Sequence, residues 1–241
     1  MPTYNERDNL PIVVTKLVSV PGLRVMVVDD GSPDGTGALA DEFARVHEGR
    51  VSVLHRTGPR GLGLSYIDGL ARALRDHDEP FICQMDADLS HNPSDVPRLV
   101  AAAADGADVV IGSRYVEGGR IENWPLHRLL LSGFANRYVR RIAGLSARDC
   151  TSGFRCWRRT ALERIPLGSI ASNDYAFLVE LLWEAHVAGC RVSEVPITFV
   201  ERRAGVSKLS SRALRESAIV PWRLARRGGA RAARGPQRAR G

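Results

Sequence analysis

The sequence predicts a single α/β domain with a mostly parallel sheet that helices cover on both faces. Apolar runs typical of strands occupy residues 23–28, 51–55, 81–85 and 107–112. Helical patterns lie between them, at residues 34–47, 63–75 and 93–104. Strands that alternate with helices of this length are typical of βαβ units, whose parallel strands are buried on both faces.

The alternation ends after Gly112, and the rest of the chain is organised differently. A glycine-rich loop at 117–125 leads to an amphipathic helical pattern at 126–142, and a strongly apolar helix at 175–188 precedes a strand at 192–200. We expect one main domain over residues 1–209, an amphipathic helix over 210–227 and a disordered basic tail over 228–241. Pro221 predicts a break within the second of these segments.

The first ten residues form a polar turn that leads into a helix at about 7–18, with no strand pattern before it. In a doubly wound sheet, a polar turn that faces a ligand normally follows a strand. The sequence therefore predicts that the first strand lies upstream of Met1.

Charge is distributed unevenly along the chain. The formal net charge is +7 and the pI is about 9.7. Residues 201–241 hold 12 Lys and Arg against 2 acidic residues, whereas residues 1–200 hold 22 against 25. A basic tail points to an anionic partner such as a membrane surface or a nucleic acid.

No apolar run approaches the roughly 20 residues that cross a bilayer. The four cysteines form no Cys-x-x-Cys pair and no signal peptide precedes them, so we expect a reduced, cytoplasmic location.

Charged side chains follow three of the apolar runs. Asp29 and Asp30 follow the first, Asp86 and Asp88 follow the third, and Arg114 follows the fourth. The carboxyl ends of parallel strands meet at one edge of a sheet, where ligands bind. Carboxylates suit Mg²⁺ or Mn²⁺, which bind one or two carboxylates together with substrate phosphates, and arginine fits phosphate oxygens. A metal-bound diphosphate at this edge would explain all three clusters.

Other interpretations of these motifs stay open when each is taken alone. Asp88 and Ser90 could cap the helix that begins near Pro93, and Arg114 could form a surface ion pair. The glycine segment at 58–69 does not fit the dinucleotide pattern G-x-G-x-x-G, and close packing at a strand-to-helix turn explains it better.

Eight motifs occur in an order that resembles a known family. They are PTYNE (2–6), DDGSPDGT (29–36), GLGLSY (61–66), DADLSHNP (86–93), GSRY (112–115), GGRIENW (118–124), TSGFR (151–155) and RRAGVSKL (202–209). Together they resemble the dolichol/polyprenol-phosphate mannose synthases, within the inverting family 2 glycosyltransferases of GT-A fold. The resemblance covers about residues 1–210.

The resemblance implies roles for the matching positions. The nucleoside of GDP-mannose would contact Pro2, Tyr4, Glu6, Val28 and Asp30, with Asp29 beside them. The diphosphate would meet Asp86, Ala87 and Asp88, and a metal, Mg²⁺ or Mn²⁺, would be held by Asp86, Asp88 and Ser90. Arg114 and Arg128 would engage phosphates and act with Asp88 as catalytic residues, while Arg202 and Lys208 would lie in a segment that closes over the nucleotide.

The implied reaction is the transfer of mannose from GDP-mannose to a polyprenyl or dolichyl monophosphate, with inversion to a β-linked product. The resemblance also implies a peripheral position on the cytoplasmic face of a membrane, where helix 126–142 and the tail would contact lipid. The alternative is that the apolar stripe of helix 126–142 is core and the tail is solvated. Recruitment by a membrane-anchoring partner protein stays open.

Two other functions compete with this reading. A transferase that uses UDP-glucose or a UDP-N-acetylhexosamine with the same lipid phosphate would differ in only a few pocket contacts. A nucleic-acid-binding protein could use the Arg-rich tail, but it would leave the clustered carboxylates unexplained. We therefore expect no nucleic-acid partner.

Overall fold

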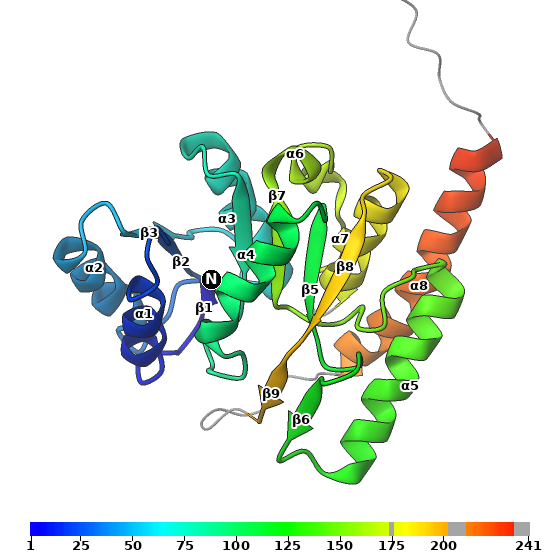
Figure 1. Cartoon of the computed structure of the whole chain (residues 1–241), viewed down its shortest axis with the longest axis horizontal. Coiled ribbons are helices and arrows are strands. Elements are labelled where there is room, and N and C mark those ends of the chain that lie inside the picture. The colour runs from blue at the N-terminus through cyan, green and yellow to red at the C-terminus, as the bar shows by residue number, and fades with distance from the viewer. Residues whose placement is uncertain (174–175, 202–210, 234–241) are drawn as a thin grey trace, which may run out of the picture.

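The computed structural model describes residues 1–173, 176–201 and 211–233. In the last of these segments it describes the side chains of residues 215–228. The strands lie between layers of helices (Figure 1). The strands are β1 (Pro2–Thr3), β2 (Val25–Asp29), β3 (Val51–His55), β4 (Phe81–Gln84), β5 (Val109–Ser113), β6 (Arg120–Glu122), β7 (Arg155–Arg158), β8 (Val192–Pro196) and β9 (Thr198–Val200). The helices are α1 (Leu10–Val18), α2 (Thr36–Val46), α3 (Leu62–Asp76), α4 (Val96–Ala104), α5 (Leu126–Ala143), α6 (Arg159–Leu162), α7 (Ala176–Val187) and α8 (Ser211–Ala233), with short 3₁₀ turns at Pro93–Asp95 and Leu167–Ser169.

The described strands form three hydrogen-bonded groups. Strands β1, β2 and β3 are parallel neighbours, and the second group has the order β4-β7-β5-β8. Within it β7 is antiparallel to both its neighbours, while β5 and β8 are parallel. The predicted strand at 192–200 is two strands, because β8 pairs with β5 whereas β9 turns away to pair with β6.

Alternate residues of β5 face two separate cores, which confirms that helices cover both faces. Val109 and Ile111 belong to the core that includes residues of α3, α5 and α7. Val110 belongs to the other core, with residues of α1 and α4. This alternation is the two-residue period of a strand buried on both sides. The predicted α/β architecture, with a single domain and a mostly parallel sheet, is therefore confirmed.

The opening residues differ from the prediction of a turn with no strand before it. Pro2 and Thr3 form the short strand β1 and pair with Val28 and Asp29 of β2. A cavity of about 840 Å³ separates β2 from β4, and both strands contribute to its lining. The three-stranded and four-stranded groups are thus joined through helices and not through a continuous ladder.

Helix α8 continues through Pro221, where the sequence predicts a break, and past residue 228, where it predicts a disordered tail. Residues 234–241 lie outside the described part. Figure 1 shows α8 beside α5, and Tyr138 of α5 donates a hydrogen bond from its hydroxyl to the carbonyl of Ala218 at 2.7 Å. Val220 and Leu224 are buried in the core. Tertiary packing therefore overrides the local effect of the proline.

Two arginines of α8 are held by two buried acids of α7. Arg223 and Arg227 form ion pairs with Glu180 at 2.9 and 2.8 Å, and Arg227 also reaches Glu184 at 2.7 Å. A buried carboxylate is costly unless it is paired. These arginines of the basic C-terminal region therefore serve the fold. In the part of the chain that the structure describes, no helix is both long and apolar enough to span a bilayer.

Candidate functional site

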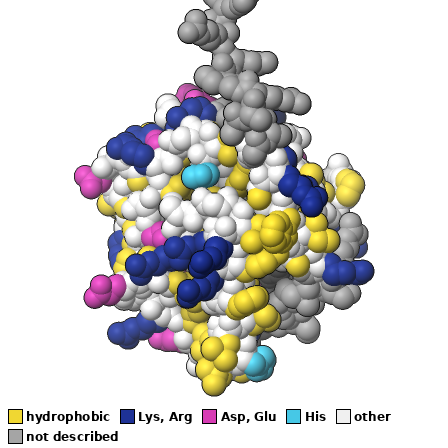
Figure 2. Space-filling model, turned by 90° about the vertical axis from the view of Figure 1, so that its right-hand side faces the viewer, with side chains coloured by type: hydrophobic (Ala, Val, Ile, Leu, Met, Phe, Trp, Pro, Cys, Tyr) yellow, Lys and Arg dark blue, Asp and Glu magenta, His cyan; other side chains and the backbone are white. Residues whose placement is uncertain are grey.

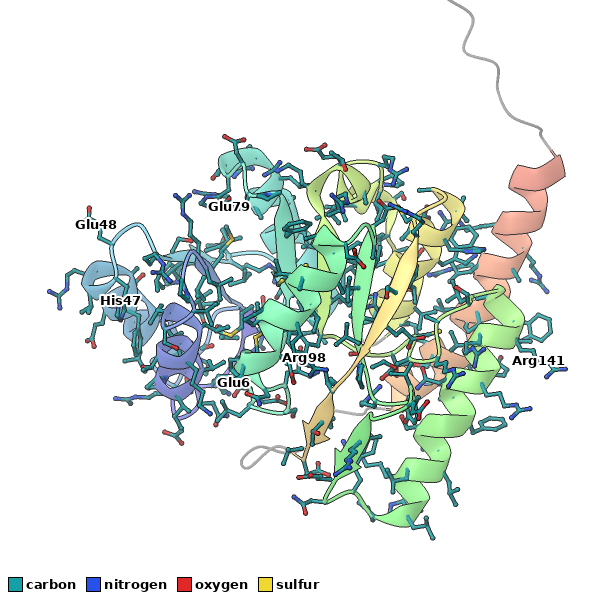
Figure 3. The ribbon with its side chains drawn as sticks, viewed as in Figure 1. Glu6, His47, Glu48, Glu79, Arg98 and Arg141 are labelled. Atoms are coloured by element: carbon teal, nitrogen blue, oxygen red, sulfur yellow. The ribbon has the colours of Figure 1, made fainter. Side chains whose placement is uncertain are left out.

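The polar strand ends gather at one edge of the molecule, at the bottom of Figure 1 beside β6 and β9. Figure 3 shows Glu6 at this edge and Glu79, which precedes β4, at the opposite one. Strands β2, β4 and β5 therefore point their carboxyl ends at the same place, as the sequence predicts.

Asp29 and Asp30 are buried and already have protein partners. Asp29 accepts hydrogen bonds from the hydroxyl of Ser32 at 2.5 Å and from its backbone N–H at 3.2 Å, which fixes the turn after β2. Asp30 accepts from Arg56 Nη1 through one oxygen and from the backbone N–H of Gly61, at 2.9 Å, through the other. Each ionised oxygen can accept a further bond, so this pairing ties the turn after β2 to the glycine loop and leaves acceptor capacity.

The other residues expected at the nucleoside surround the same turn. Thr3 accepts a backbone hydrogen bond from Asp30 at 3.0 Å. Tyr4 receives a hydrogen bond from Arg60, whose guanidinium also lies 5.0 Å from the centre of the tyrosine ring. Glu6 accepts from Asn9 at 2.8 Å. Pro2 and Val28 are paired in the β1–β2 ladder, with Val28 buried.

The Asp-x-Asp motif follows β4 and is more open. Asp86 is one-third exposed and accepts a hydrogen bond from the hydroxyl of Tyr66 at 2.7 Å. Asp88 accepts from the backbone N–H of Ser90 at 3.0 Å. Ala87 between them is buried, as is Ser90. The cap interpretation is wrong for Asp88 and Ser90, because Asn92 caps the 3₁₀ turn at Pro93 and the hydrogen bond of Asp88 lies in the loop before it.

Buried groups around Asp86 are held neutral. Burial, together with the charges of Asp86 and Asp88, raises the pKa of Tyr66 well above its usual range, so its hydroxyl stays a donor to Asp86. Burial lowers the pKa of His91, although Asp86 and Asp88 oppose the shift. The backbone N–H of Asp86 donates to His91 Nδ1 at 3.3 Å, which places the imidazole proton on Nε2. The negative charge at this point of the edge therefore rests on the two carboxylates.

The donor set fits a hard divalent cation that shares its coordination with a substrate. Two carboxylates stand one residue apart, and Gly153 offers no side chain beside them, since a Cβ there would lie 3.3 Å from Asp86 Oδ2. Among the described residues, no group of three or more His, Cys, Asp or Glu could form a complete metal cage. Mg²⁺ commonly binds one or two carboxylates plus phosphates and water. The arrangement thus suits Mg²⁺ or Mn²⁺ bound together with a diphosphate.

Arg114 is buried and forms a two-pronged pair with Asp149. Its Nε and Nη2 donate to the two carboxylate oxygens at 2.7 Å each, and Nη2 also donates to Thr151 at 2.8 Å. Burial opposes ionisation of both groups, but their mutual attraction outweighs it, raising the pKa of Arg114 and lowering that of Asp149. The sequence left open that Arg114 forms an ion pair at the surface. Arg114 does form an ion pair, but the pair is not at the surface, because the side chain of Asp149 is fully buried.

Arg128 and Arg114 both lie near the ring of Trp124. The guanidinium of Arg128 lies 4.0 Å from the centre of the indole ring, whereas that of Arg114 lies 5.9 Å from it. Arg128 pairs with Glu201 at 2.5 and 2.7 Å, and both side chains are about one-quarter exposed. The structure therefore brings the two predicted arginines together around one aromatic ring.

Phe199 connects the arginines to the Asp-x-Asp loop. It packs edge-on against His91, with ring centres 5.4 Å apart, and lies 5.3 Å from the guanidinium of Arg114. The carbonyl of Ser90 accepts a hydrogen bond from Val200 at 3.2 Å. Carboxylates and arginines thus form one continuous site. Arg202 and Lys208 lie outside the described residues.

Four residues of the site had no role in the sequence analysis. Tyr66 and Gly153 lie within the GLGLSY and TSGFR motifs, which marked their segments but not their contacts with Asp86. Asp149 and Arg56 belong to no motif and are partners of Arg114 and Asp30. Their roles depend on contacts between distant segments, for which the sequence carried no signal.

Comparison with known proteins agrees with this geometry. Residues 1–166 match the model of the family Glycosyl transferase family 2. The chain is 48% identical over 225 residues to polyprenol monophosphomannose synthase of Mycolicibacterium smegmatis, covering 92% of this chain and 84% of that protein. It is 44% identical over 231 residues to undecaprenyl-phosphate mannosyltransferase of Micrococcus luteus, covering 94% and 93%.

Among solved structures, glucosyl-3-phosphoglycerate synthase of Mycobacterium tuberculosis has a similar fold. Its complex with Mn²⁺, UDP-glucose and phosphoglyceric acid superposes with a TM-score of 0.64 at 19% identity, covering 95% of this chain and 78% of that one. Fold, motifs and sequence similarity agree. The chain belongs to glycosyl transferase family 2.

Proposed function

We propose that this protein transfers mannose from GDP-mannose to a polyprenyl or dolichyl monophosphate, with inversion at the sugar. One observation carries the proposal. Two partly exposed carboxylates, Asp86 and Asp88, share one edge with two arginines, Arg114 and Arg128, whose guanidinium groups both lie near the ring of Trp124. The carboxylates suit a metal-bound diphosphate, and the arginines suit a second phosphate opposite it.

The similar proteins support the same reaction. Both relatives are named for mannose transfer to a polyprenyl phosphate, and each aligns over more than nine-tenths of this chain. The choice of GDP-mannose as donor follows from the resemblance of the motifs, with Pro2, Tyr4, Glu6, Val28, Asp29 and Asp30 around the nucleoside.

On the donor side, Asp86, Ala87, Asp88 and Ser90 would hold the diphosphate and a divalent ion. Mg²⁺ or Mn²⁺, when bound there, supplies positive charge that stabilises the leaving GDP. Tyr66 holds Asp86 by a hydrogen bond, and Gly153 keeps the approach to its carboxylate open. Arg202 and Lys208 are proposed to close over the nucleotide.

On the acceptor side, the arginines hold the attacking phosphate. Arg114 uses Nε and Nη2 for Asp149 and Thr151, and no described residue is hydrogen-bonded to its Nη1. A phosphate monoester is anionic at neutral pH, so its oxygen attacks the anomeric carbon without a strong general base. Attack from the face opposite the diphosphate converts the α-linked donor into a β-linked mannosyl phosphate.

The direct test is transfer of radiolabelled mannose from GDP-mannose to a purified polyprenyl phosphate, with a chelator as the control. We expect a lipid product that forms only with Mg²⁺ or Mn²⁺. A panel of UDP-glucose, UDP-N-acetylglucosamine and GDP-mannose checks the donor. Faster transfer from a UDP-sugar would overturn the assignment to mannose.

We also propose that the protein works at the cytoplasmic face of a membrane. Large exposed apolar side chains gather on α5, at Leu126, Leu130, Leu131 and Phe134, and on α8, at Ile219 and Trp222. Phe134 stacks on Tyr138, whose hydroxyl accepts from Trp222 Nε1 at 2.8 Å, so the two groups are continuous. Figure 2 shows apolar side chains across this side of the molecule, next to a group of Lys and Arg. Such a surface suits the bilayer interface.

A further inference from the structure

A hollow beside α5 is lined by arginines that the proposed reaction does not use. It has a volume of about 490 Å³, and its lining includes Arg137, Arg140, Arg141 and Arg148 together with Tyr115 and Asn136. We call it the arginine hollow. Figure 3 shows Arg141 on the outer side of the upper half of α5, away from the edge where Glu6 lies.

The four guanidinium groups have no acidic partner among the described residues. None of them forms an ion pair there, in contrast to Arg114 and Arg128. Arg140 Nε is buried and lacks a hydrogen-bond acceptor in the same part of the chain. An unsatisfied buried N–H of a cation is costly, and because Arg140 also lines the hollow, an anion bound there would offset part of this cost.

The nearby acids are already committed elsewhere. Asp149 is paired with Arg114, and Glu194 accepts the backbone N–H groups of Arg148 and Asp149 at 2.7 and 3.0 Å. The field in the hollow is therefore positive, and the planar arginine fork matches phosphate oxygens.

The hollow is separate from the acceptor arginines but linked to them. Asn136 in its wall donates to Thr151 at 3.1 Å, and Thr151 accepts from Arg114 on the other side. The exposed Leu130, Leu131 and Phe134 lie on the preceding turns of the same helix. A phosphate in the hollow would therefore have apolar surface beside it.

We infer that the arginine hollow binds the phosphate of an anionic membrane phospholipid, whose acyl chains lie over the apolar side chains of α5. Bound there, the lipid orients α5 on the membrane and keeps Arg128, near the start of the same helix, facing the acceptor. The inference rests on the proposed function in so far as that function places the protein at a membrane.

The test is flotation of the full chain with vesicles of phosphatidylcholine alone and with added phosphatidylglycerol. The hollow variant replaces Arg137, Arg140, Arg141 and Arg148 by Gln, and a control replaces Arg24, Arg45, Arg72 and Arg75, which removes equal charge elsewhere. Each basic residue near an anionic surface strengthens binding about fivefold, so we expect the hollow variant to bind the anionic vesicles at least about tenfold more weakly than the control. If both variants lost vesicle binding to the same extent, the inference would be overturned.

Three further measurements separate this site from simpler explanations. Arg140→Lys keeps the charge but loses the fork, so we expect weaker binding, and unchanged binding would show non-specific attraction and contradict a built site. The pair Arg137→Gln and Arg141→Gln, both exposed, should show part of the loss if the fourfold variant does not fold. Saturable binding of inorganic phosphate in the absence of lipid would assign the hollow to a free phosphate and overturn the lipid assignment.

Transfer to a short-chain polyprenyl phosphate in detergent distinguishes the two proposals. We expect the hollow variant to retain this activity, because Arg114 and Arg128 are intact. Loss of the activity in the variant would place the hollow within the acceptor site and overturn the inference. Absence of activity in the unaltered protein would overturn the proposed function, while the flotation result would still decide whether the hollow binds lipid.

Discussion

The edge at which strands β2, β4 and β5 end has an acidic side and a basic side, and the two sides differ in how their charged groups are held. On the side of β2 and β4, carboxylates face the edge. Asp86 remains one-third exposed, and among the described residues Tyr66 alone donates to its side chain. On the side of β5 and α5, arginines face the edge, and Arg114 and Arg128 are each paired with a carboxylate. In the proposed function, an added cation completes the Asp-x-Asp part of the acidic side, whereas the protein itself already orients the arginines of the basic side. Four substitutions test this difference.

Asp88→Asn should have the largest effect. It removes a carboxylate from the proposed metal site, so the charge on the leaving diphosphate loses its stabilisation, and kcat should fall about 10³-fold. The measurement is mannose transfer across a range of Mn²⁺ concentrations. Asp105→Asn, at the end of α4, is the matched control and should be neutral. Full activity of the Asp88 variant with either metal would refute the metal assignment.

Asp149→Asn should act mainly on stability. It leaves the buried Arg114 without its charged partner, and breaking such a pair costs about 3 kcal/mol of the free energy of unfolding. The folded-state pKa of Asp149 lies below its ordinary value of about 3.9. The ion pair therefore contributes its full stabilisation above about pH 3.9, and this stabilisation is lost as the pH falls through the folded-state pKa. Urea unfolding at several pH values checks this. If the free energies of unfolding of the two proteins still differed by the same amount at the most acidic pH, the stabilising role of the ion pair would be contradicted.

Arg128→Ala should weaken use of the acceptor and spare the donor. We expect kcat/KM for the polyprenyl phosphate to fall about 10²-fold, with KM for GDP-mannose nearly unchanged. Arg120→Ala, an exposed residue on the neighbouring β6, serves as control. A variant that lost affinity for GDP-mannose instead would move Arg128 to the donor side.

Gly153→Ala should have the smallest effect of the four. The new methyl would lie 3.3 Å from Asp86 Oδ2 and disturb the carboxylate without removing it. We expect about a tenfold loss of apparent metal affinity, with little change in kcat at saturating metal. Gly168→Ala introduces a methyl where no atom lies within 4 Å and is the control. Equal behaviour of the two variants would show that Gly153 does not shape the metal site.

The sequence predicted those parts of the molecule that depend on local patterns. The βαβ alternation and the Asp-x-Asp motif are readable because each lies within one short segment. The pairs Arg114–Asp149 and Arg128–Glu201 join segments 35 and 73 residues apart, and no local pattern reports them. Strand β7 escaped prediction because it is short, contains two arginines and is inserted between β4 and β5.

The C-terminal helix shows how tertiary contacts alter a reading by composition. Its arginines indicated an anionic partner outside the protein, yet Arg223 and Arg227 bind Glu180 and Glu184 within it. The sequence did hold a signal for this pairing. Glu180 and Glu184 lie in the otherwise apolar α7, and buried carboxylates require partners.

In the proposed reaction, a divalent cation joins the Asp-x-Asp carboxylates to the diphosphate of the donor. Calorimetric titration of GDP-mannose into the protein, with Mn²⁺ and then with a chelator, tests it most directly. We expect much tighter binding with Mn²⁺ in the unaltered protein and no such difference in Asp88→Asn. Equal affinity with and without the metal in the unaltered protein would contradict it.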